Sequence, residues 1–300
     1  MTSGSTKRFY LNSSRLQPTA RNPSMNGAQL LGATETGLFY ALVSLAAWIT
    51  LRVIQFPDLT VDGTFTLGAA VTAVTLAAGI HPVLALFLST LASCCAGLMT
   101  ALLHVKAKIP GLMASILVTT GLYSINMRIM GKPNVSIDMD LLTGSQELAL
   151  SASAVLFLIL FLYWLFLSNF GLAIRAIGIN PKVCPAYGIK LETMQETALS
   201  LSNAIVNFTG GCFAIAQGFS HISMGTDIIV VGSAAVMIGE AICGKDNLLL
   251  TLIGCVLSSI LYRIGVGFAL NAHAISLQPS DTNLITAILI VMMINRPRTS

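Results

Sequence analysis

Nine apolar runs divide this chain, and they constrain its fold more than any other feature of the sequence. The runs lie at roughly 37–56, 64–80, 82–104, 109–130, 148–168, 193–219, 228–243, 247–270 and 283–295. A helix needs about 20 residues to cross a hydrocarbon core about 30 Å thick. Most of the runs reach that length, whereas 64–80 and 228–243 are shorter. The pattern predicts an all-α polytopic membrane helix bundle.

Composition supports this interpretation. Hydrophobic residues make up 55% of the chain and charged residues 9%, whereas about a quarter of the residues of an ordinary soluble domain are charged. Most of the surface must therefore face lipid. Gly, Ala, Ser and Thr recur inside the runs, and such small residues let membrane helices approach closely. The net charge of +4 is too small to indicate a nucleic-acid partner.

The sequence does not indicate enzymatic or metal chemistry. The six cysteines lack paired metal-ligand spacing, so we expect them to pack as small apolar side chains. Gly239–Asp246, GEAICGKD, resembles a P-loop, but Asp246 stands where Ser or Thr must follow the Lys to hold Mg²⁺. We expect no catalytic residue, metal or cofactor here, and any ATP hydrolysis would belong to another subunit.

The N-terminal part divides from the rest by its polarity. Residues 1–33 carry four basic residues and no acidic one. They predict a disordered cytoplasmic tail, because basic residues accumulate on the cytoplasmic side of membranes. Residues 34–296 are expected to form a single transmembrane domain.

The charges of the later loops predict which loops share a side of the membrane. If every run crossed, Lys106, Lys108 and the basic loop Asn169–Glu192 would lie outside, against the positive-inside rule. If 57–80 is instead a re-entrant or broken segment that returns to the side it came from, these loops lie inside and the acidic segment Gly131–Glu147 lies outside. This arrangement gives about eight full crossings with both termini in the cytoplasm.

Polar residues within or beside the runs predict a path for a solute, because polar groups inside a membrane are commonly functional. Asp58 and Asp62 lie at the mouth of the short run, where either one could also cap the next helix. Asn203 and Asn207 share a helix face, where they could line the path or bridge neighbouring helices. Glu240 lies near a helix end and is expected to pair with a cation. The candidates for the path are Asp58, Asp62, Thr66, Asn126, Asn203, Asn207 and Gln217.

Two segments suggest an internal duplication. Asp62 precedes the small-residue run FTLGAAVTAV, and Asp227 precedes IIVVGSAAVM. A polar turn and a long apolar run follow in both places. Many transporters consist of two such halves with the solute path at their interface, so the fold has a possible two-half pseudo-repeat.

The loop Asn169–Glu192 has a spacing that positive-inside charge alone does not explain. Asn180-Pro181 can start a short helix, because Pro is tolerated in the first turn. Val183 and Tyr187, four residues apart, would then present one apolar face. We therefore expect this loop to be a docking surface for a soluble partner.

The same loop resembles a known family. Gly171-x-x-x-Arg175-Ala176, followed by Asn180-Pro181 and by Gly188-Ile189, is similar to the segment that docks the ATPase in permeases of bacterial ABC importers of the branched-chain amino acid and ribose type. The resemblance covers about residues 35–295. Within it, FPDLTVDGTFTLGAA resembles a subgroup of which some members are associated with aromatic amino acid uptake. Cys184-Pro185 stands where the family usually has small residues or Ala. This difference makes an irregular docking helix possible.

The resemblance implies a permease subunit of an ABC importer in a bacterial inner membrane, moving a small polar solute, with an amino acid favoured. Its partners would be ABC ATPase subunits, a periplasmic or lipid-anchored solute-binding protein, a second permease copy, identical or different, and membrane lipid. The implied ATPase-coupling residues are Gly171, Arg175, Ala176, Gly178, Asn180, Pro181, Val183, Tyr187 and Gly188.

Two other classes of function compete with this one. An ion-coupled secondary transporter would work without an ATPase and would need titratable groups deep in its spans, whereas Asp58, Asp62 and Glu240 are expected near span ends. A membrane-embedded enzyme would need a catalytic constellation, which the sequence does not contain.

Overall fold

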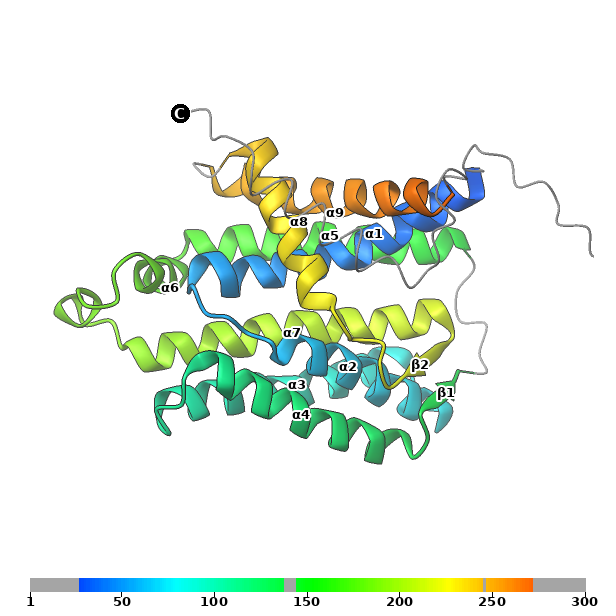
Figure 1. Cartoon of the computed structure of the whole chain (residues 1–300), viewed down its shortest axis with the longest axis horizontal. Helices are drawn as coiled ribbons and strands as arrows, with labels where there is room; N and C mark the ends of the chain where they lie inside the picture. The colour runs from blue at the N-terminus through cyan, green and yellow to red at the C-terminus, as the bar shows by residue number, and fades with distance from the viewer. Residues whose placement is uncertain (1–26, 138–143, 245–246, 272–300) are drawn as a thin grey trace, which may run out of the picture.

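The structure of the protein is a computed structural model that describes residues 27–137, 144–244 and 247–271 (Figure 1). Its helices are α1 (Gly27–Trp48), α2 (Thr60–Ala77), α3 (Pro82–Val105), α4 (Gly111–Met130), α5 (Gly144–Leu167), α6 (Asn169–Ile179), α7 (Leu191–Gln217), α8 (Ile228–Cys243) and α9 (Leu248–Asn271). A π-helical turn, η2 (Ile49–Val53), extends α1, and a 3-10 turn, η3 (Cys184–Tyr187), follows α6. Within the described residues, seven helical segments are long and apolar enough to cross a membrane. The predicted all-α polytopic bundle is confirmed.

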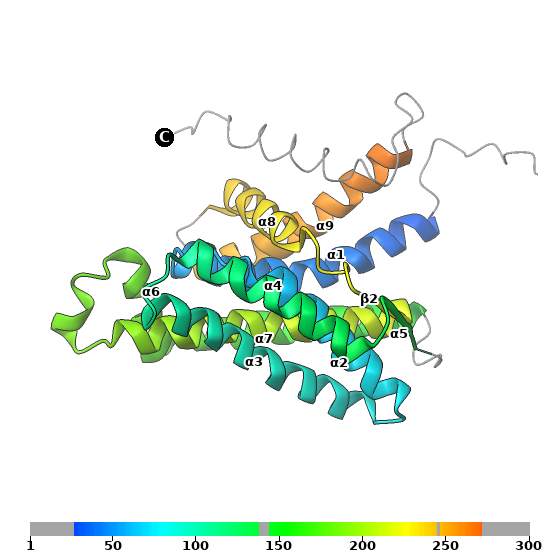
Figure 2. The ribbon, with the colours of Figure 1, turned by 60° about the horizontal axis from the view of Figure 1, so that its bottom comes forward.

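The long helices lie side by side and give the molecule two ends (Figure 1). One end carries α6 and η3, and we call it the α6 end. The other carries two short antiparallel strands, β1 (Asn134–Ser136) and β2 (Phe219–His221), and we call it the β end. Figure 2 shows the same separation of the two ends after rotation. Any membrane would lie between them.

The segment between α1 and α2 is broken, as predicted, but it does not return to the side from which it entered. At the α6 end, Val53 lies against Gly178 of α6. The chain then runs inward to Asp58, which accepts a hydrogen bond from Asn203 near the middle of α7. At the far end of α2, Leu76 packs in one cluster with Val135 of β1. Residues 54–77 therefore pass from the α6 end to the β end.

This passage changes the predicted topology. The loop after α3 lies at the α6 end, since the Phe56 ring contacts the His104 ring at a centroid distance of 5.1 Å. The expectation that this loop shares a side with Asn169–Glu192, and that β1 lies opposite, is confirmed. However, α1 starts at the β end (Figure 1). The start of α1 and the loop Asn169–Glu192 therefore lie on opposite sides of the membrane and cannot both be cytoplasmic, as the predicted topology required. Residues 1–26 and the run 283–295 lie outside the described residues.

The suggested duplication is visible as repeated close approaches. A Cβ added to Gly68 in α2 would collide with the backbone of Asn207 in α7. A Cβ added to Gly232 in α8 would meet Val43 in α1. The number of residues from Gly68 to Gly232 equals the number from Val43 to Asn207. Thus α1 and α2 correspond to α7 and α8.

The two halves run in opposite directions. In Figure 1, α1 runs toward the α6 end and α7 runs away from it, while α2 and α8 start near mid-length and diverge. This is an inverted repeat in which one helix of each half starts near mid-length, an arrangement in which transporters place their solute path near the bilayer midplane. The fold thereby directs attention to the starts of α2 and α8.

Candidate functional site

The tip of the α6 end, which consists of α6, the turn after it and η3, differs from the predicted structure. Ser168 caps α6 by accepting a hydrogen bond from the Gly171 N–H at 3.3 Å. The helix ends at Ile179, and the Asn180 N–H donates to the Ala176 carbonyl at 3.0 Å. The prediction that Asn180-Pro181 starts a helix is therefore wrong. A turn follows Asn180, and the next element is the short η3 rather than an α-helix.

The tip nevertheless presents apolar side chains to its surroundings. Ile179 is 84% exposed, Tyr187 80% and Val183 43%. Beneath them, the buried Cys184 thiol donates to the Asn180 carbonyl at 3.3 Å. Gly188 ends η3 in the left-handed region at φ +73, a conformation that glycine adopts without strain. The sequence prediction identified Val183 and Tyr187 and missed Ile179, which lies at the end of the preceding helix.

Two glycines hold α6 against the rest of the protein. A Cβ at Gly171 would collide with the backbone of Leu165 and Phe166, and one at Gly178 with the Val53 carbonyl oxygen. These approaches leave no room for a larger side chain, so α6 is held against the end of α5 and against η2. Ala176 is half-buried in the same helix.

The charged and polar members of the tip point outward. Arg175, Asn180, Pro181 and Gly188 are exposed. Within the described part of the chain, Arg175 forms no ion pair. The exposed Arg175 guanidinium is therefore available to an acidic partner.

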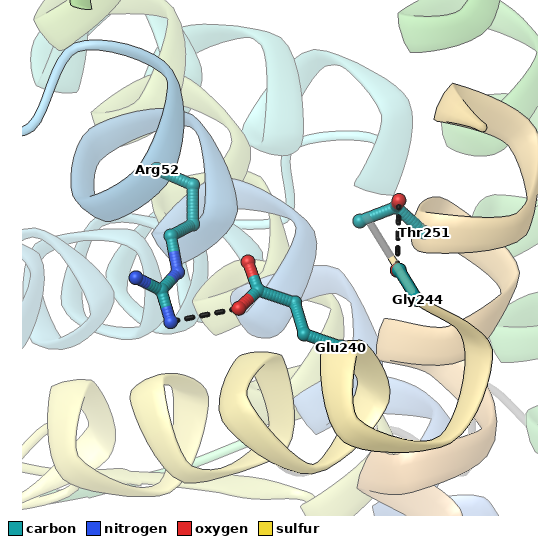
Figure 3. A network of polar contacts seen from close by, with 4 residues as sticks. All are labelled: Arg52, Glu240, Gly244 and Thr251. Atoms are coloured by element: carbon teal, nitrogen blue, oxygen red, sulfur yellow. Dashed lines mark hydrogen bonds and ion pairs between the residues drawn. The ribbon is translucent and has the colours of Figure 1, made fainter. Parts of the chain in front are cut away.

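An ion pair connects the element beneath the tip to α8 (Figure 3). The Arg52 Nη2 atom of η2 lies 2.7 Å from Glu240 Oε2 of α8. The Glu240 side chain is 7% exposed and the Arg52 side chain 38%. The expected cation partner of Glu240 is thus Arg52. Because η2 also contacts α6 through Val53 and Gly178, it lies between α6 and α8.

The second part of the site is a cavity of about 180 Å³ between α2, α4 and the segment before α8. Asp62, Thr66 and Asn126, three of the predicted path residues, line it together. Its full lining is Asp62, Gly63, Thr66, Thr119, Tyr123, Asn126, Ile222, Gly225 and Thr226. The sequence prediction missed the residues of α4 other than Asn126 and the turn before α8, because these segments meet only in the fold.

Hydrogen bonds fix the shape of this cavity. The Asp62 Oδ1 atom accepts the Ile229 N–H at the start of α8 at 3.0 Å. The Thr66 hydroxyl accepts the Gly225 N–H at 3.0 Å. The Asn126 Nδ2 group donates to the Gly63 carbonyl at 3.1 Å. Asp62 therefore caps α8, not α2, and connects the starts of these two helices.

Three other predicted path residues form a buried network between α2 and α7. Asp58 Oδ1 accepts the Thr60 N–H at 2.9 Å, the predicted cap of α2, and Asp58 Oδ2 accepts from Asn203 at 2.8 Å. Asn203 also accepts from the Thr64 hydroxyl, and Asn207 donates to the Thr64 carbonyl. These amides bridge helices and do not line the cavity.

The last predicted path residue, Gln217, lies apart from the others. It is exposed and is the final residue of α7, at the β end. The structure does not bring it to the cavity.

Comparison with known proteins agrees with this geometry. A family model described as the permease component of the branched-chain amino acid transport system matches residues 30–294. A tyrosine transport system permease protein of Clostridioides difficile (strain R20291) is 33% identical over 265 residues, covering 87% of this chain and 89% of that protein.

A second relative, an uncharacterized protein of Rickettsia prowazekii (strain Madrid E), is 31% identical over 278 residues, covering 89% of this chain and 96% of that protein. No solved structure matches the chain. The family match spans nearly all of the described helices, and the sequence relatives cover almost their whole lengths. The chain therefore belongs to the branched-chain amino acid transport permease family, as a permease subunit of an ABC importer.

Proposed function

We propose that this permease carries an amino acid across the bacterial inner membrane and that the α6–η3 tip binds the ATPase that drives it. The observation that carries the proposal is the tip itself, with Ile179, Val183 and Tyr187 exposed on a segment held closely against the bundle. An apolar cluster that protrudes from a membrane protein beyond its spans marks a protein contact. The name of the Clostridioides difficile relative, a tyrosine transport permease, supports an amino acid as the solute.

The contacts beneath the tip give a route for mechanical coupling. Movement of α6 would act on η2 through Gly178 and Val53. From η2 it would reach α8 through the ion pair of Arg52 with Glu240. The start of α8 is in turn bonded to Asp62 at the cavity. A rigid series of contacts therefore joins the proposed ATPase site to the proposed solute path.

This proposal sets the orientation and the partners. The α6 end faces the cytoplasm and the ATPase, so the β end and the start of α1 face the solute-binding protein outside. A second permease copy, identical or related, completes the pore. The basic residues Arg175, Lys182 and Lys190 at the α6 end agree with the positive-inside rule.

One observation favours the competing secondary transporter. Asp58 contacts the middle of α7 through Asn203, and Asp62 lies in the first turn of α2, a helix that starts near mid-length of the bundle. The expectation that these carboxylates lie near span ends is therefore wrong. Ion-coupled transporters use buried carboxylates of this kind, so the test must separate ATP-driven from ion-driven uptake.

The test is uptake and ATP hydrolysis by the importer reconstituted with its ATPase and binding protein. Replacing Val183 and Tyr187 together by Ala should lower solute-stimulated ATPase activity and uptake by about tenfold or more. Truncating apolar side chains at the centre of an interface can cost about 2 kcal/mol of binding free energy. A tenfold loss of affinity corresponds to about 1.4 kcal/mol. Arg175→Glu should have an effect in the same direction.

The matched control is Leu156→Ala with Phe157→Ala, which truncates two exposed apolar side chains on α5. This control should retain both activities. Wild-type coupling in the tip variants would refute ATPase docking at this tip. Uptake that persists without ATP and follows an ion gradient would instead establish the secondary transporter.

A further inference from the structure

We infer that the cavity beside Asp62 binds the primary ammonium group of the solute during its passage. This inference rests on the proposed function, since it assigns a chemical role to one point of the path. It concerns the cavity of about 180 Å³ between α2, α4 and the turn before α8.

An unsatisfied acceptor in the cavity wall is the first observation. Asn126 is 1% exposed and lines the cavity. Its Nδ2 group is engaged with the Gly63 carbonyl, which fixes the direction of the amide. Its Oδ1 atom has no hydrogen-bond partner among the described residues. Buried acceptors are nearly always satisfied, so an unsatisfied one in the wall of a cavity indicates a missing donor.

A carboxylate is the second observation. Asp62 lines the same cavity and is in the first turn of α2. It accepts the backbone N–H groups of Ile229 and Asp227, and an ionised carboxylate can accept about four hydrogen bonds in all. The start of α8 contributes about half a positive charge, which offsets part of the charge of Asp62. The cavity wall therefore keeps a net negative character.

The donors that could hold an anion are already used. The N–H groups of Ile228–Val231, the first four of α8, all donate to oxygens of Gly225, Asp62 and Asp227. Among the described residues that line the cavity, none is basic. A carboxylate or phosphate group would meet few donors there, whereas an ammonium group has three donors and no acceptor.

The remaining wall suits an amine attached to an organic body. Thr119 donates its hydroxyl hydrogen to the carbonyl of Leu59 or Ser115, so its oxygen can accept a further hydrogen bond. The Tyr123 side chain lines the cavity and is 54% exposed. An aromatic face attracts a cation and also packs against apolar groups. The site thus combines acceptors with an aromatic wall.

The experiment is equilibrium binding of radiolabelled tyramine, an amine without a carboxylate, to the full-length permease in lipid nanodiscs. Asp62→Asn keeps an acceptor for the Ile229 N–H and removes the charge. It should weaken tyramine binding by about tenfold or more, as expected for loss of a hydrogen bond to a charged group. Asn126→Leu should weaken it in the same direction.

The matched control is Glu196→Gln, which removes a carboxylate of α7 that lies outside the cavity lining. Its tyramine affinity should stay within about twofold of wild type, less than the 1.4 kcal/mol of a tenfold change. The thermal unfolding midpoint of each variant separates lost binding from lost folding.

Two competitors complete the test. The deaminated analogue 3-(4-hydroxyphenyl)propionate should not displace tyramine. Displacement by this acid, unchanged binding in Asp62→Asn, or no saturable tyramine binding in wild type would overturn the inference. Displacement by sodium ions at concentrations equal to those of tyramine would also overturn it and identify an inorganic cation site. Because the assay needs neither ATP nor uptake, its result is separable from that of the coupling experiment.

Discussion

At the scale of single residues, the helix contacts depend on positions where a side chain does not fit. Gly68 and Gly210 bring α2 and α7 so close that a Cβ at either one would collide with a backbone carbonyl of the other helix. In lipid, where helices gain little from burying apolar surface, such close backbone packing is a main source of association. These glycines therefore fix the position of α2 and of the cavity on it.

We expect Gly68→Ala to lower the thermal unfolding midpoint in detergent, because overpacking a tight contact costs about 1–3 kcal/mol. The control is Gly121→Ala, in α4, where an added Cβ meets nothing within 4 Å. That control should be neutral or stabilising, since Ala is a better helix former than Gly by about 1 kcal/mol. Equal midpoints for the two variants would contradict the packing of α2 on α7.

The sequence allowed some residue roles to be predicted and not others. Local patterns predicted that Asp58 or Asp62 would cap α2 and that Glu240 would pair with a cation; Asp58 accepts the Thr60 N–H, and Arg52 is the cation. The role of Asp62 at α8 could not be predicted, because its partner Ile229 is distant in the sequence. Tyr123 in the cavity wall was missed for the same reason.

At the scale of elements, η2 is the connection that matters most to coupling. It is a π-helical turn, a form that is rare and often found at functional sites. It contacts α6 by its backbone and α8 by the side chain of Arg52. The sequence contains no signal for this turn, since residues 49–53 continue the apolar run of α1.

We expect Arg52→Gln to reduce coupling, because it removes the guanidinium beside a mostly buried carboxylate and so loosens α8 from η2. Breaking one side of such a pair costs up to about 3–5 kcal/mol when both groups are buried, and less here because Arg52 is partly exposed. The measurement is the ratio of solute transported to ATP hydrolysed.

A double-mutant cycle with Glu240→Gln provides the control. If the pair transmits movement, the double variant should lose no more coupling than either single variant. Additive losses would mean that Arg52 and Glu240 act independently, which would remove this step from the route.

Element boundaries show where sequence reasoning reached its limit. Asn180-Pro181 carries the signature of a helix start, yet α6 already occupies the residues before it and ends at Ile179. Helix starts and turns share the same residue types, so tertiary contact at Gly178 decides between them. Similarly, the short run 64–80 predicted a broken segment, but its exit side depends on packing against β1.

At the scale of the whole molecule, the inverted repeat accounts for both short runs. Each half contributes one helix that begins near mid-length, α2 in the first half and α8 in the second (Figure 1). The prediction treated one short run as returning and the other as crossing. The repeat requires that both runs cross. This adds one crossing between the start of α1 and α6, so the two lie on opposite sides of the membrane. The suggested duplication thus indicated that both short runs cross the membrane, which the loop charges did not.

The central claim is that the α6–η3 tip is the ATPase-binding surface, and the most direct measurement is site-specific photo-crosslinking in the assembled importer. A photoreactive amino acid at Ile179, which is 84% exposed, should crosslink to the ATPase. The same group at Val83, which is 68% exposed at the opposite end, should not. A crosslink to the ATPase from Val83, or from Ile179 to the solute-binding protein instead, would contradict the account.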